Sequence, residues 1–467
     1  MLADRGTRVR RVPGVINPSS ALLTDHYELT MLAAALRDGT ADRRCAFEVF
    51  ARGLPAGRRY GVVAGTGRLL ELLTDFRFGD AEMASLADRH VVDAETLAHL
   101  ARWQFTGDVW GYGEGETFFP ASPVLSVEGT FADCVLLETL ILSVLNHDCA
   151  IAAAASRMVT AAAGRPLLEM GSRRTHEQAA VAAARAAYLV GFESSSNLEA
   201  ARRHGVPTGG TSAHAFVLLH DDEQAAFTSQ LTALTEDTTL LVDTYDVDDA
   251  VRLGVQLSGG RLGAVRIDSG NLPDEARRVR RLLDSLGAGA TRIVVSGDLD
   301  EFSIAALSDV PVDMYGVGTS LVTGSGAPTA GLVYKLVARQ LVARGPLLPV
   351  AKRSPGKEGR GGRATAHRQV KDGVAVAELL GTLAPDEERA SGDLAEGSHS
   401  GGSSGAGGSS GSGGSERSLV RALVVHGEVV GAELLAAARA RHAGSLAELP
   451  ARARELGAGP PALDVIR

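Results

Sequence analysis

The chain has 467 residues, of which 45% are hydrophobic. It is long enough for two domains, because single cores rarely grow beyond ~250–300 residues. Its net charge of −9 argues against a general nucleic-acid partner, since phosphate backbones demand basic surfaces. No apolar core follows the N-terminal arginines, and the Ala-rich run at 151–163 is too short to span a bilayer. We therefore expect no secretory signal, no membrane partner and a cytoplasmic location.

The three cysteines, Cys45, Cys134 and Cys149, are widely separated in the chain. An odd number without metal-ligand spacing predicts reduced, buried thiols and neither a disulfide framework nor a zinc site.

The first part of the chain mixes helix and strand patterns. Residues 1–20 are expected to form a flexible arm. Helical patterns follow at 27–37 and 65–74, strand patterns at 45–51 and 105–129, and a long apolar helix from 135 to about 155. These elements predict a smaller α/β domain over 21–135.

Between residues 166 and 321, short apolar runs alternate with helical segments. The runs lie at 166–170, 239–244, 264–267, 292–295 and 312–315, and several end in polar or Gly-rich residues. Strand, polar end and helix in repetition predict an irregular parallel α/β barrel over 136–344. In such barrels the active site lies at the carboxyl ends of the strands.

The remaining residues divide into three parts. Residues 345–395 are expected to return to the smaller domain, which is then built from N-terminal and C-terminal segments. Residues 396–417 are almost pure Gly and Ser over much of their length and predict a disordered linker. The tail at 418–467 predicts a short strand pair and a helix at 431–441, with no evident chemistry.

Two Gly-rich strand ends are typical of phosphate binding, because glycines let backbone amides approach an anion and hydroxyls add donors. Taken singly, each is also compatible with an ordinary loop. The residues concerned are Ser296, Gly297, Asp298, Gly316, Gly318 and Thr319.

Two further strand ends place cations beside possible ligands. Arg266 and Asp268 are two residues apart on a strand and share a face, so they can address one ligand or simply pair with each other. Arg173 and Arg174 follow another strand, where a guanidinium can clamp a carboxylate or phosphate in bidentate fashion.

His214 follows a turn rich in glycine and hydroxyl groups that includes Thr211. Such a turn can cradle phosphate beside the imidazole, and a neutral imidazole is a competent phosphoryl acceptor near pH ~7. Asp243 and Asp246 at the next strand end are both candidates to fix its tautomer.

The order of these motifs resembles the nicotinate phosphoribosyltransferase family from about residue 21 to residue 364. Nine short motifs occur in the family's succession, at 25–31, 128–139, 169–174, 195–197, 210–214, 243–246, 266–270, 296–300 and 316–320.

This resemblance implies a two-domain type II phosphoribosyltransferase with an irregular, incomplete barrel. It also implies a homodimer with active sites at the subunit interface. Tyr27 of the neighbouring subunit would stack on the pyridine ring, and Met170 stands where many relatives carry phenylalanine. Arg173 matches the residue that holds the ring substrate, with hydroxyls such as Ser196 suited to its carboxylate. His214 matches the histidine that is phosphorylated.

The resemblance also implies roles for the remaining strand ends. Asp243 lies beside the phosphorylated histidine, and Arg266 and Asp268 match residues near ribose and pyrophosphate. The phosphate-binding loops match Gly297, Asp298, Gly318 and Thr319. The implied reaction joins nicotinate to phosphoribosyl pyrophosphate at the expense of ATP, with Mg²⁺ bound to the substrate phosphates and no dedicated metal site.

Four other functions are alternatives to this one. Nicotinamide-using relatives carry an aspartate near the ring, whereas the matching stretch here is Ser194–Asn197 without a carboxylate. A quinolinate enzyme would need further cations and no phosphohistidine. A non-catalytic paralogue is disfavoured by the retained His214, Asp243 and Asp268. A Schiff-base aldolase needs a lysine at a strand end, yet no lysine precedes Lys335.

Overall fold

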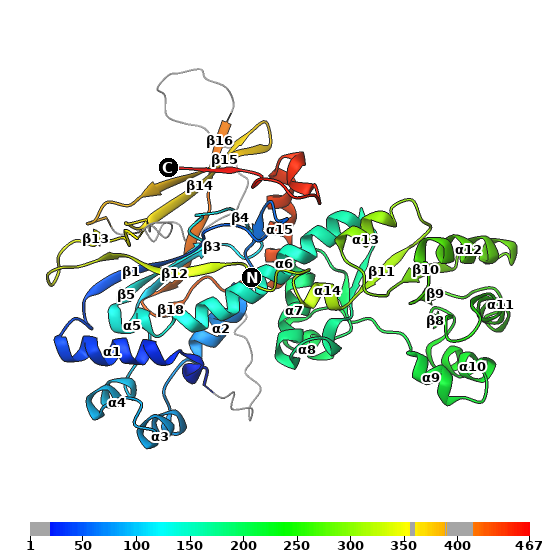
Figure 1. The fold of residues 1–467 in the computed structure, drawn as a ribbon, viewed down its shortest axis with the longest axis horizontal. Helices are drawn as coiled ribbons and strands as arrows, with labels where there is room; N and C mark the ends of the chain where they lie inside the picture. Colours follow the sequence, from blue (N-terminus) through cyan, green and yellow to red (C-terminus); the bar gives the residue numbers. More distant parts are fainter. Residues whose placement is uncertain (1–18, 355–359, 388, 390–413) are drawn as a thin grey trace, which may run out of the picture.

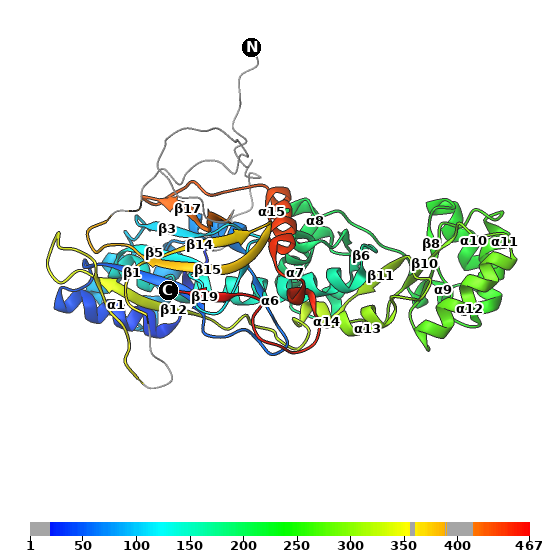
Figure 2. The same cartoon turned by 90° about the horizontal axis from the view of Figure 1, so that it is seen from above.

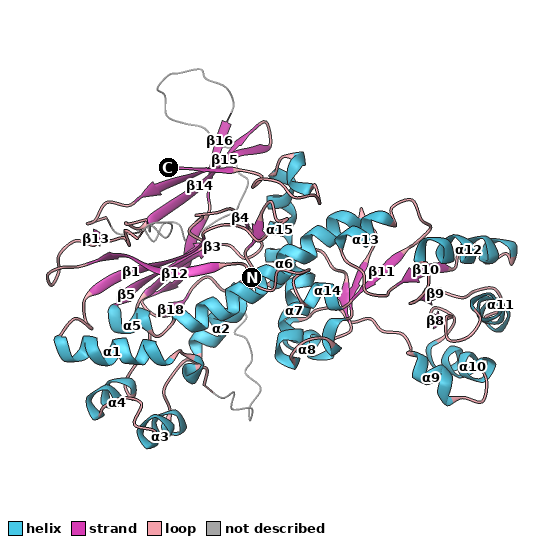
Figure 3. Cartoon of the chain, in the orientation of Figure 1, coloured by secondary structure: helices cyan, strands magenta, loops and turns pink. Residues whose placement is uncertain are grey.

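The computed structural model describes residues 19–354, 360–387, 389 and 414–467. Two lobes lie end to end and are joined by one long helix, α6 (Glu138–Ala162) (Figure 1). Mainly antiparallel sheets fill the first lobe, and a parallel sheet with surrounding helices fills the second (Figure 3). The expected division into α/β parts is therefore present, but its boundaries differ from those that the sequence predicts.

A seven-stranded antiparallel sheet forms the centre of the first lobe, in the order β13-β12-β1-β5-β3-β17-β18. Its strands are β1 (Arg44–Ala51), β3 (Asp108–Tyr112), β5 (Leu125–Thr130), β12 (Leu332–Arg339), β13 (Leu348–Pro349), β17 (Val420–Val425) and β18 (Glu428–Val429). Beside it lie η1 (Ala21–Leu23), α1 (His26–Asp38), α2 (Thr66–Thr74), α3 (Asp80–Asp88), α4 (Ala94–Leu100) and α5 (Phe131–Val135). Cys45, Cys134 and Cys149 are free and buried, as predicted.

A second, four-stranded sheet covers this lobe in the order β16-β14-β15-β19 (Figure 2). It consists of β14 (Ala364–Lys371), β15 (Val374–Thr382), β16 (Gly414–Ser418) and β19 (Asp464–Ile466). A small ladder joins β2 (Gly61–Val62) to β4 (Thr117–Phe118).

The second lobe contains six parallel strands in the order β7-β6-β11-β10-β9-β8. These are β6 (Leu167–Glu169), β7 (Ser194–Ser195), β8 (Thr239–Leu241), β9 (Ala264–Ile267), β10 (Arg292–Val295) and β11 (Met314–Val317). Around them lie η2 (Gly171–Arg173), α7 (Glu177–Val190), α8 (Leu198–His204), α9 (His214–Leu219), α10 (Glu223–Leu234), α11 (Val247–Leu257), α12 (Leu272–Ser285), α13 (Glu301–Ala306) and α14 (Thr319–Val322).

This parallel sheet is a curled half-barrel and not a full barrel. In the described part of the chain, β7 and β8 are the two edges of the sheet and do not pair with each other. The parallel α/β prediction is thus confirmed at the level of strands and helices, while the closure expected of a barrel is not. Past β7 the described residues add a single parallel bridge, from Ser195 to Thr208, and no strand that joins β7 to β8.

Helix α6 starts and ends later than the sequence pattern predicts, at Glu138 and Ala162. Its first half packs in the core of the first lobe through side chains such as Leu140 and Ile141. Its second half is Ala-rich and lies in the core of the second lobe. By length and composition alone this helix could cross a membrane, but 72% of its apolar window is buried inside the protein, as in a core helix.

The tail is part of both lobes and contains the strand pair that the sequence predicts, β17 with β18. β17 lies between β3 and β18, and β19 pairs in parallel with β15. The tail helix is α15 (Leu435–Glu448) instead of 431–441, and η4 (Ala451–Arg454) follows it. His442 of α15 is 2% exposed and its imidazole contacts Ser156 of α6 and the carbonyl of Gly115.

Three further boundaries need correction. β12, expected within the barrel segment 136–344, pairs antiparallel with β1 in the first lobe. β16 begins at Gly414, inside the segment expected as a linker; residues 396–413 lie outside the described residues. Of the expected arm, 1–18 lie outside them as well, while Ser20 is buried and its hydroxyl donates to the Leu72 carbonyl.

Buried ion pairs connect the elements around α6. Glu114 receives two hydrogen bonds from Arg185 of α7, at 2.6 and 2.8 Å, and one from the Gly65 amide at 2.6 Å. Glu301 of α13 binds both Arg58 and Arg157, at 2.9 and 3.0 Å. Pairs of this kind are costly to break because the remaining charge stays buried, so they fix how the two lobes meet.

Candidate active site

The carboxyl ends of the parallel strands meet at one edge of the half-barrel. Strands β6, β8, β9, β10 and β11 each lead at this edge into a loop that carries sequence-predicted site residues. Ligands of open parallel sheets bind in the crevice outside these strand ends. The fold therefore collects on one edge residues that are far apart in the chain.

His214 and Asp243 form a direct pair. His214 is the first residue of α9, and its Nε2 lies 3.1 Å from Oδ1 of Asp243, which follows β8. The histidine side chain is 40% exposed, whereas the carboxylate is only 4% exposed. Asp246, the other candidate partner, instead accepts a hydrogen bond from the Asp249 amide as the N-cap of α11. Asp243 is thus the residue that orients the imidazole.

The second oxygen of Asp243 is held by the next strand end. Oδ2 accepts hydrogen bonds from the Asp268 amide at 2.9 Å and from the Ser269 hydroxyl at 2.7 Å. Burial by itself raises the pKa of Asp243, but these two hydrogen bonds and the bond to His214 outweigh it and leave the pKa below its ordinary value. The carboxylate is therefore ionised and fixed in orientation at neutral pH.

Arg266 and Asp268 face the same space but do not form a close pair. The nearest nitrogen and oxygen of these side chains are 4.0 Å apart. Arg266 donates from Nη1 to the Thr211 hydroxyl at 2.7 Å, and Asp268 accepts from the hydroxyl of Ser296. A simple ion pair between Arg266 and Asp268 is therefore disfavoured, because Arg266 is held by Thr211 and Asp268 by Ser296.

Several buried polar atoms at this edge lack a hydrogen-bond partner in the structure. They are Nε of Arg266, the hydroxyl of Ser212 and the hydroxyl of Thr244. Buried polar groups are normally paired, so orphaned donors in one place call for a polar ligand or ordered water. Neither Ser212 nor Thr244 was singled out by the sequence, although each directly adjoins a predicted residue.

The Gly-rich strand ends after β10 and β11 require their glycines. Gly297 has φ +115° and Asp298 has φ +50°, a region that disfavours most side chains. A Cβ on Gly316 would lie 2.7 Å from the sulfur of Met170, so glycine is needed there for close packing. Gly318 precedes Thr319, the first residue of α14. The glycines thus let the strand ends pack closely where phosphate binding is predicted.

The end of β6 holds the predicted ring-binding residues. Met170 donates its amide to the Val317 carbonyl at 2.8 Å, and Arg173 ends the η2 turn with an exposed side chain. Ser196, beyond β7, donates its amide to the carbonyl of Glu169 at 2.8 Å. Adjacent strand ends therefore place Met170, Arg173 and Ser196 on one side of the site.

Tyr27 is not brought to this edge within one chain. It lies on α1 in the first lobe, far from the parallel strand ends (Figure 1), and is 45% exposed. Burial, followed by the nearby Glu138 carboxylate, raises its pKa, so the phenol stays protonated. Its predicted role depends on a second copy of the chain.

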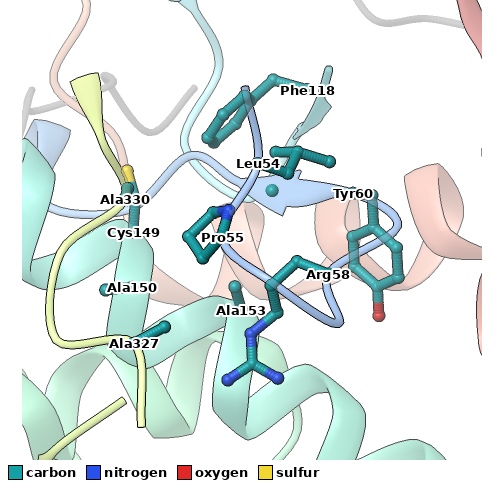
Figure 4. A pocket seen from close by; sticks show the side chains of 11 residues that line it. Leu54, Pro55, Arg58, Tyr60, Phe118, Cys149, Ala150, Ala153, Ala327 and Ala330 are labelled. Atoms are coloured by element: carbon teal, nitrogen blue, oxygen red, sulfur yellow. The ribbon is translucent and has the colours of Figure 1, made fainter. Parts of the chain in front are cut away.

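Two cavities elsewhere in the described structure are lined by other residues. A small apolar cavity of about 10 Å³ beside α6 is lined by residues including Leu54, Phe118 and Cys149 (Figure 4). A wider groove of about 980 Å³ is lined by residues of α2, α6, α7 and α8. The first has room for no more than a water molecule, and the strand ends remain the candidate site.

Metal-binding side chains do not cluster in the described part of the chain: no group of three or more His, Cys, Asp or Glu could hold an ion there. The carboxylates at the strand ends, Asp243 and Asp268, are each engaged by hydrogen bonds. These two carboxylates could hold a hard cation only if substrate oxygens supply most of its ligands. Mg²⁺ is usually bound in this way at phosphates.

Parallel strand ends with an oriented histidine, an arginine and Gly-rich turns are the arrangement expected of an α/β enzyme. Comparison with known proteins supplies the family. Residues 22–146 match the nicotinate phosphoribosyltransferase (NAPRTase) N-terminal domain. The chain is 56% identical over 453 residues to nicotinate phosphoribosyltransferase pncB1 of Mycobacterium tuberculosis, covering 95% of this chain and 94% of that protein.

Two further relatives agree. The nicotinate phosphoribosyltransferase of Bacillus subtilis is 35% identical over 335 residues, with 70% of this chain and 68% of that protein covered. The crystal structure of human nicotinic acid phosphoribosyltransferase has a TM-score of 0.75 at 25% identity, covering 95% of this chain and 98% of that one. The chain belongs to the nicotinate phosphoribosyltransferase family.

Proposed function

We propose that this chain joins nicotinate to phosphoribosyl pyrophosphate, releasing pyrophosphate and nicotinate mononucleotide, and couples this to ATP hydrolysis through a phosphohistidine at His214. The names of its relatives support the reaction. The observation that supports the phosphohistidine is the imidazole of His214, partly exposed and held by the buried carboxylate of Asp243.

The pair at His214 defines which nitrogen would react. Because Nε2 faces Oδ1 of Asp243, the ionised carboxylate favours the tautomer with the proton on Nε2. Nδ1 then carries the lone pair that attacks the γ-phosphorus of ATP, forming the N–P bond as ADP leaves. The positive charge that develops on the ring is stabilised by Asp243.

In the transfer step the pyridine nitrogen attacks C1 of the ribose as pyrophosphate leaves. Arg266 and the backbone near Gly297 and Gly318 would hold the departing phosphates and Asp268 the ribose side, an assignment supported by their shared edge of the sheet. Mg²⁺ bound to the substrate phosphates would neutralise charge on the leaving group. Cationic and amide donors placed at developing charge are usually the largest contribution to catalysis.

Nicotinate is favoured over nicotinamide by the groups beside Met170. Arg173 offers a cation for a carboxylate, and Ser196 a hydroxyl. Glu169, at the end of the adjacent strand β6, is 0% exposed and accepts hydrogen bonds from Gly171 and Ser195. Its burial leaves it inaccessible to the amide N–H of a bound nicotinamide.

The proposal includes a cytoplasmic homodimer in which Tyr27 of one subunit completes the site of the other. Mixing Tyr27→Ala and His214→Ala subunits tests this, since a homodimer of either variant has no intact active site. Random exchange makes half the dimers heterodimeric with one intact site, so about a quarter of wild-type activity should return. No recovery after proven exchange would contradict a shared site.

The decisive experiment follows phosphate transfer from γ-labelled ATP, with nicotinate mononucleotide measured in parallel. Wild type and the control His176→Ala, an exposed histidine, should take an acid-labile label, and His214→Ala should not. If wild type forms product without taking the label, the phosphohistidine mechanism is wrong but the transferase activity stands. Absence of product would favour a non-catalytic paralogue.

A further inference from the structure

Glu169 is a buried carboxylate that the reaction described above does not use. It is the last residue of β6 and is 0% exposed. One oxygen accepts from the Ser195 hydroxyl at 2.5 Å and the other accepts from the Gly171 amide. Burial raises its pKa in spite of these bonds, so the protein keeps an acidic group there at a cost in free energy.

The partners of Glu169 belong to the two strand ends that carry the ring-binding residues. Gly171 opens the η2 turn, which ends at Arg173. Ser195 precedes Ser196, and the Ser195 oxygen also accepts from the Asn197 amide at 2.9 Å. One side chain therefore fixes both the turn before Arg173 and the turn that presents Ser196.

A third strand end is packed against the same point. A Cβ on Gly171 would lie 2.2 Å from Val322 of α14 and 3.1 Å from both the Glu169 carboxylate and the Gly318 carbonyl. Asn197 also donates from its side chain to the Ser172 hydroxyl at 3.0 Å. Gly171 thus lies close to α14 and to the Gly318 carbonyl, and the Glu169 carboxylate holds its amide in that position.

We propose that Glu169 is a positioning residue that sets the affinity and selectivity of the site for the carboxylate of its pyridine substrate. It does so by locking the turns of Arg173 and Ser196 against each other, without touching the substrate. This inference rests on the proposed function. His214 and Asp243 lie on other strand ends, so phosphorylation of the histidine should not depend on Glu169.

The first test is Glu169→Gln, which keeps one acceptor oxygen and loses the other. We expect KM for nicotinate to rise at least ~10-fold, as for loss of one charge-assisted hydrogen bond. The preference for nicotinate over nicotinamide should fall. KM for phosphoribosyl pyrophosphate and the label taken by His214 from ATP should stay within about twofold, unlike the effect of a general loss of structure.

Matched variants separate positioning from other causes. Glu193→Gln makes the same chemical change at an exposed residue whose amide bonds to Leu167, at the opposite end of the β6–β7 pair, and should behave as wild type. Ser195→Ala removes the hydroxyl's bonds to Glu169 and to the Asn197 amide but keeps the charged acceptor of the Gly171 amide, and should raise the same KM by less. In the double variant with Glu169→Gln, the increases in KM should not add, because both substitutions remove the same contact between Glu169 and Ser195.

The outcomes are distinct. An unchanged KM for nicotinate in Glu169→Gln, or an equal loss of His214 labelling, overturns the inference. If Glu169→Gln does not fold, Ser195→Ala decides by the same comparison of KM values. Wild type that makes no nucleotide from nicotinate overturns the proposed function instead.

Discussion

Replacing Asp243 with asparagine tests the phosphorylation chemistry most directly. The amide keeps the size of the side chain and can still accept from the Asp268 amide with its oxygen. Its NH₂ group then faces His214 and favours the tautomer with the proton on Nδ1. Both the charge and the required lone pair are lost in one substitution.

The magnitude follows from the geometry of the pair. At 3.1 Å, two unit charges interact by about 5 kcal/mol at an effective dielectric constant of about 20. The His214 side chain is 40% exposed, and solvent screening of that order leaves about 2–3 kcal/mol. We therefore expect phosphorylation to slow by about 30- to 150-fold.

The assay is single-turnover labelling from γ-labelled ATP at saturating nucleotide. Asp246→Asn is the matched control, because it makes the same change three residues further on and asparagine remains a good N-cap for α11. The control should label at the wild-type rate. Equal loss in both variants, or none in Asp243→Asn, would refute the assignment of Asp243 as the orienting group.

Three other predictions concern packing and buried charge. Gly316→Ala should displace the Met170 sulfur and weaken substrate binding at least ~10-fold, measurable as KM with an unchanged melting temperature to within a few degrees. Arg185→Met should lower the free energy of unfolding by about 3–5 kcal/mol in urea titrations, because it leaves Glu114 buried without its cation. Burial lowers the pKa of His442 from 6.5 to about 4, so the unfolded chain binds the extra proton first as pH falls. Stability should drop by about 3 kcal/mol between pH ~6.5 and ~4 in wild type, and by clearly less in His442→Gln; parallel curves for the two proteins would contradict this.

The parallel strand ends could be predicted because their pattern is local. β9 and β10 have the bounds that the apolar runs indicate, and each is followed directly by polar residues. The same pattern predicts that Asp243 or Asp246 lies beside His214, since the ends of parallel strands share an edge of the sheet. The structure adds which carboxylate makes the contact, a distinction that spacing alone cannot make.

Closure of the barrel and the place of β12 depend on distant pairing. β12 has the composition of an ordinary strand, and its partner β1 lies almost 300 residues earlier in the chain. The tail is similar: Val420–Val425 reads as a strand in the sequence, but its position next to β3 is fixed by a core that only the folded chain contains. The local sequence pattern therefore predicts that a strand forms, but not which strand it pairs with.

Glu169 belongs to one of the sequence motifs, but the sequence does not show that its side chain connects two turns. A glutamate before Met170 reads there as one more polar residue at a strand end. Its importance comes from complete burial and from two partners on different turns. Arg173 and Ser196 are exposed side chains on short turns, and hydrogen bonds from buried neighbours hold these turns in place. A buried acceptor shared by both turns supplies the rigidity that recognition of a small, planar carboxylate requires.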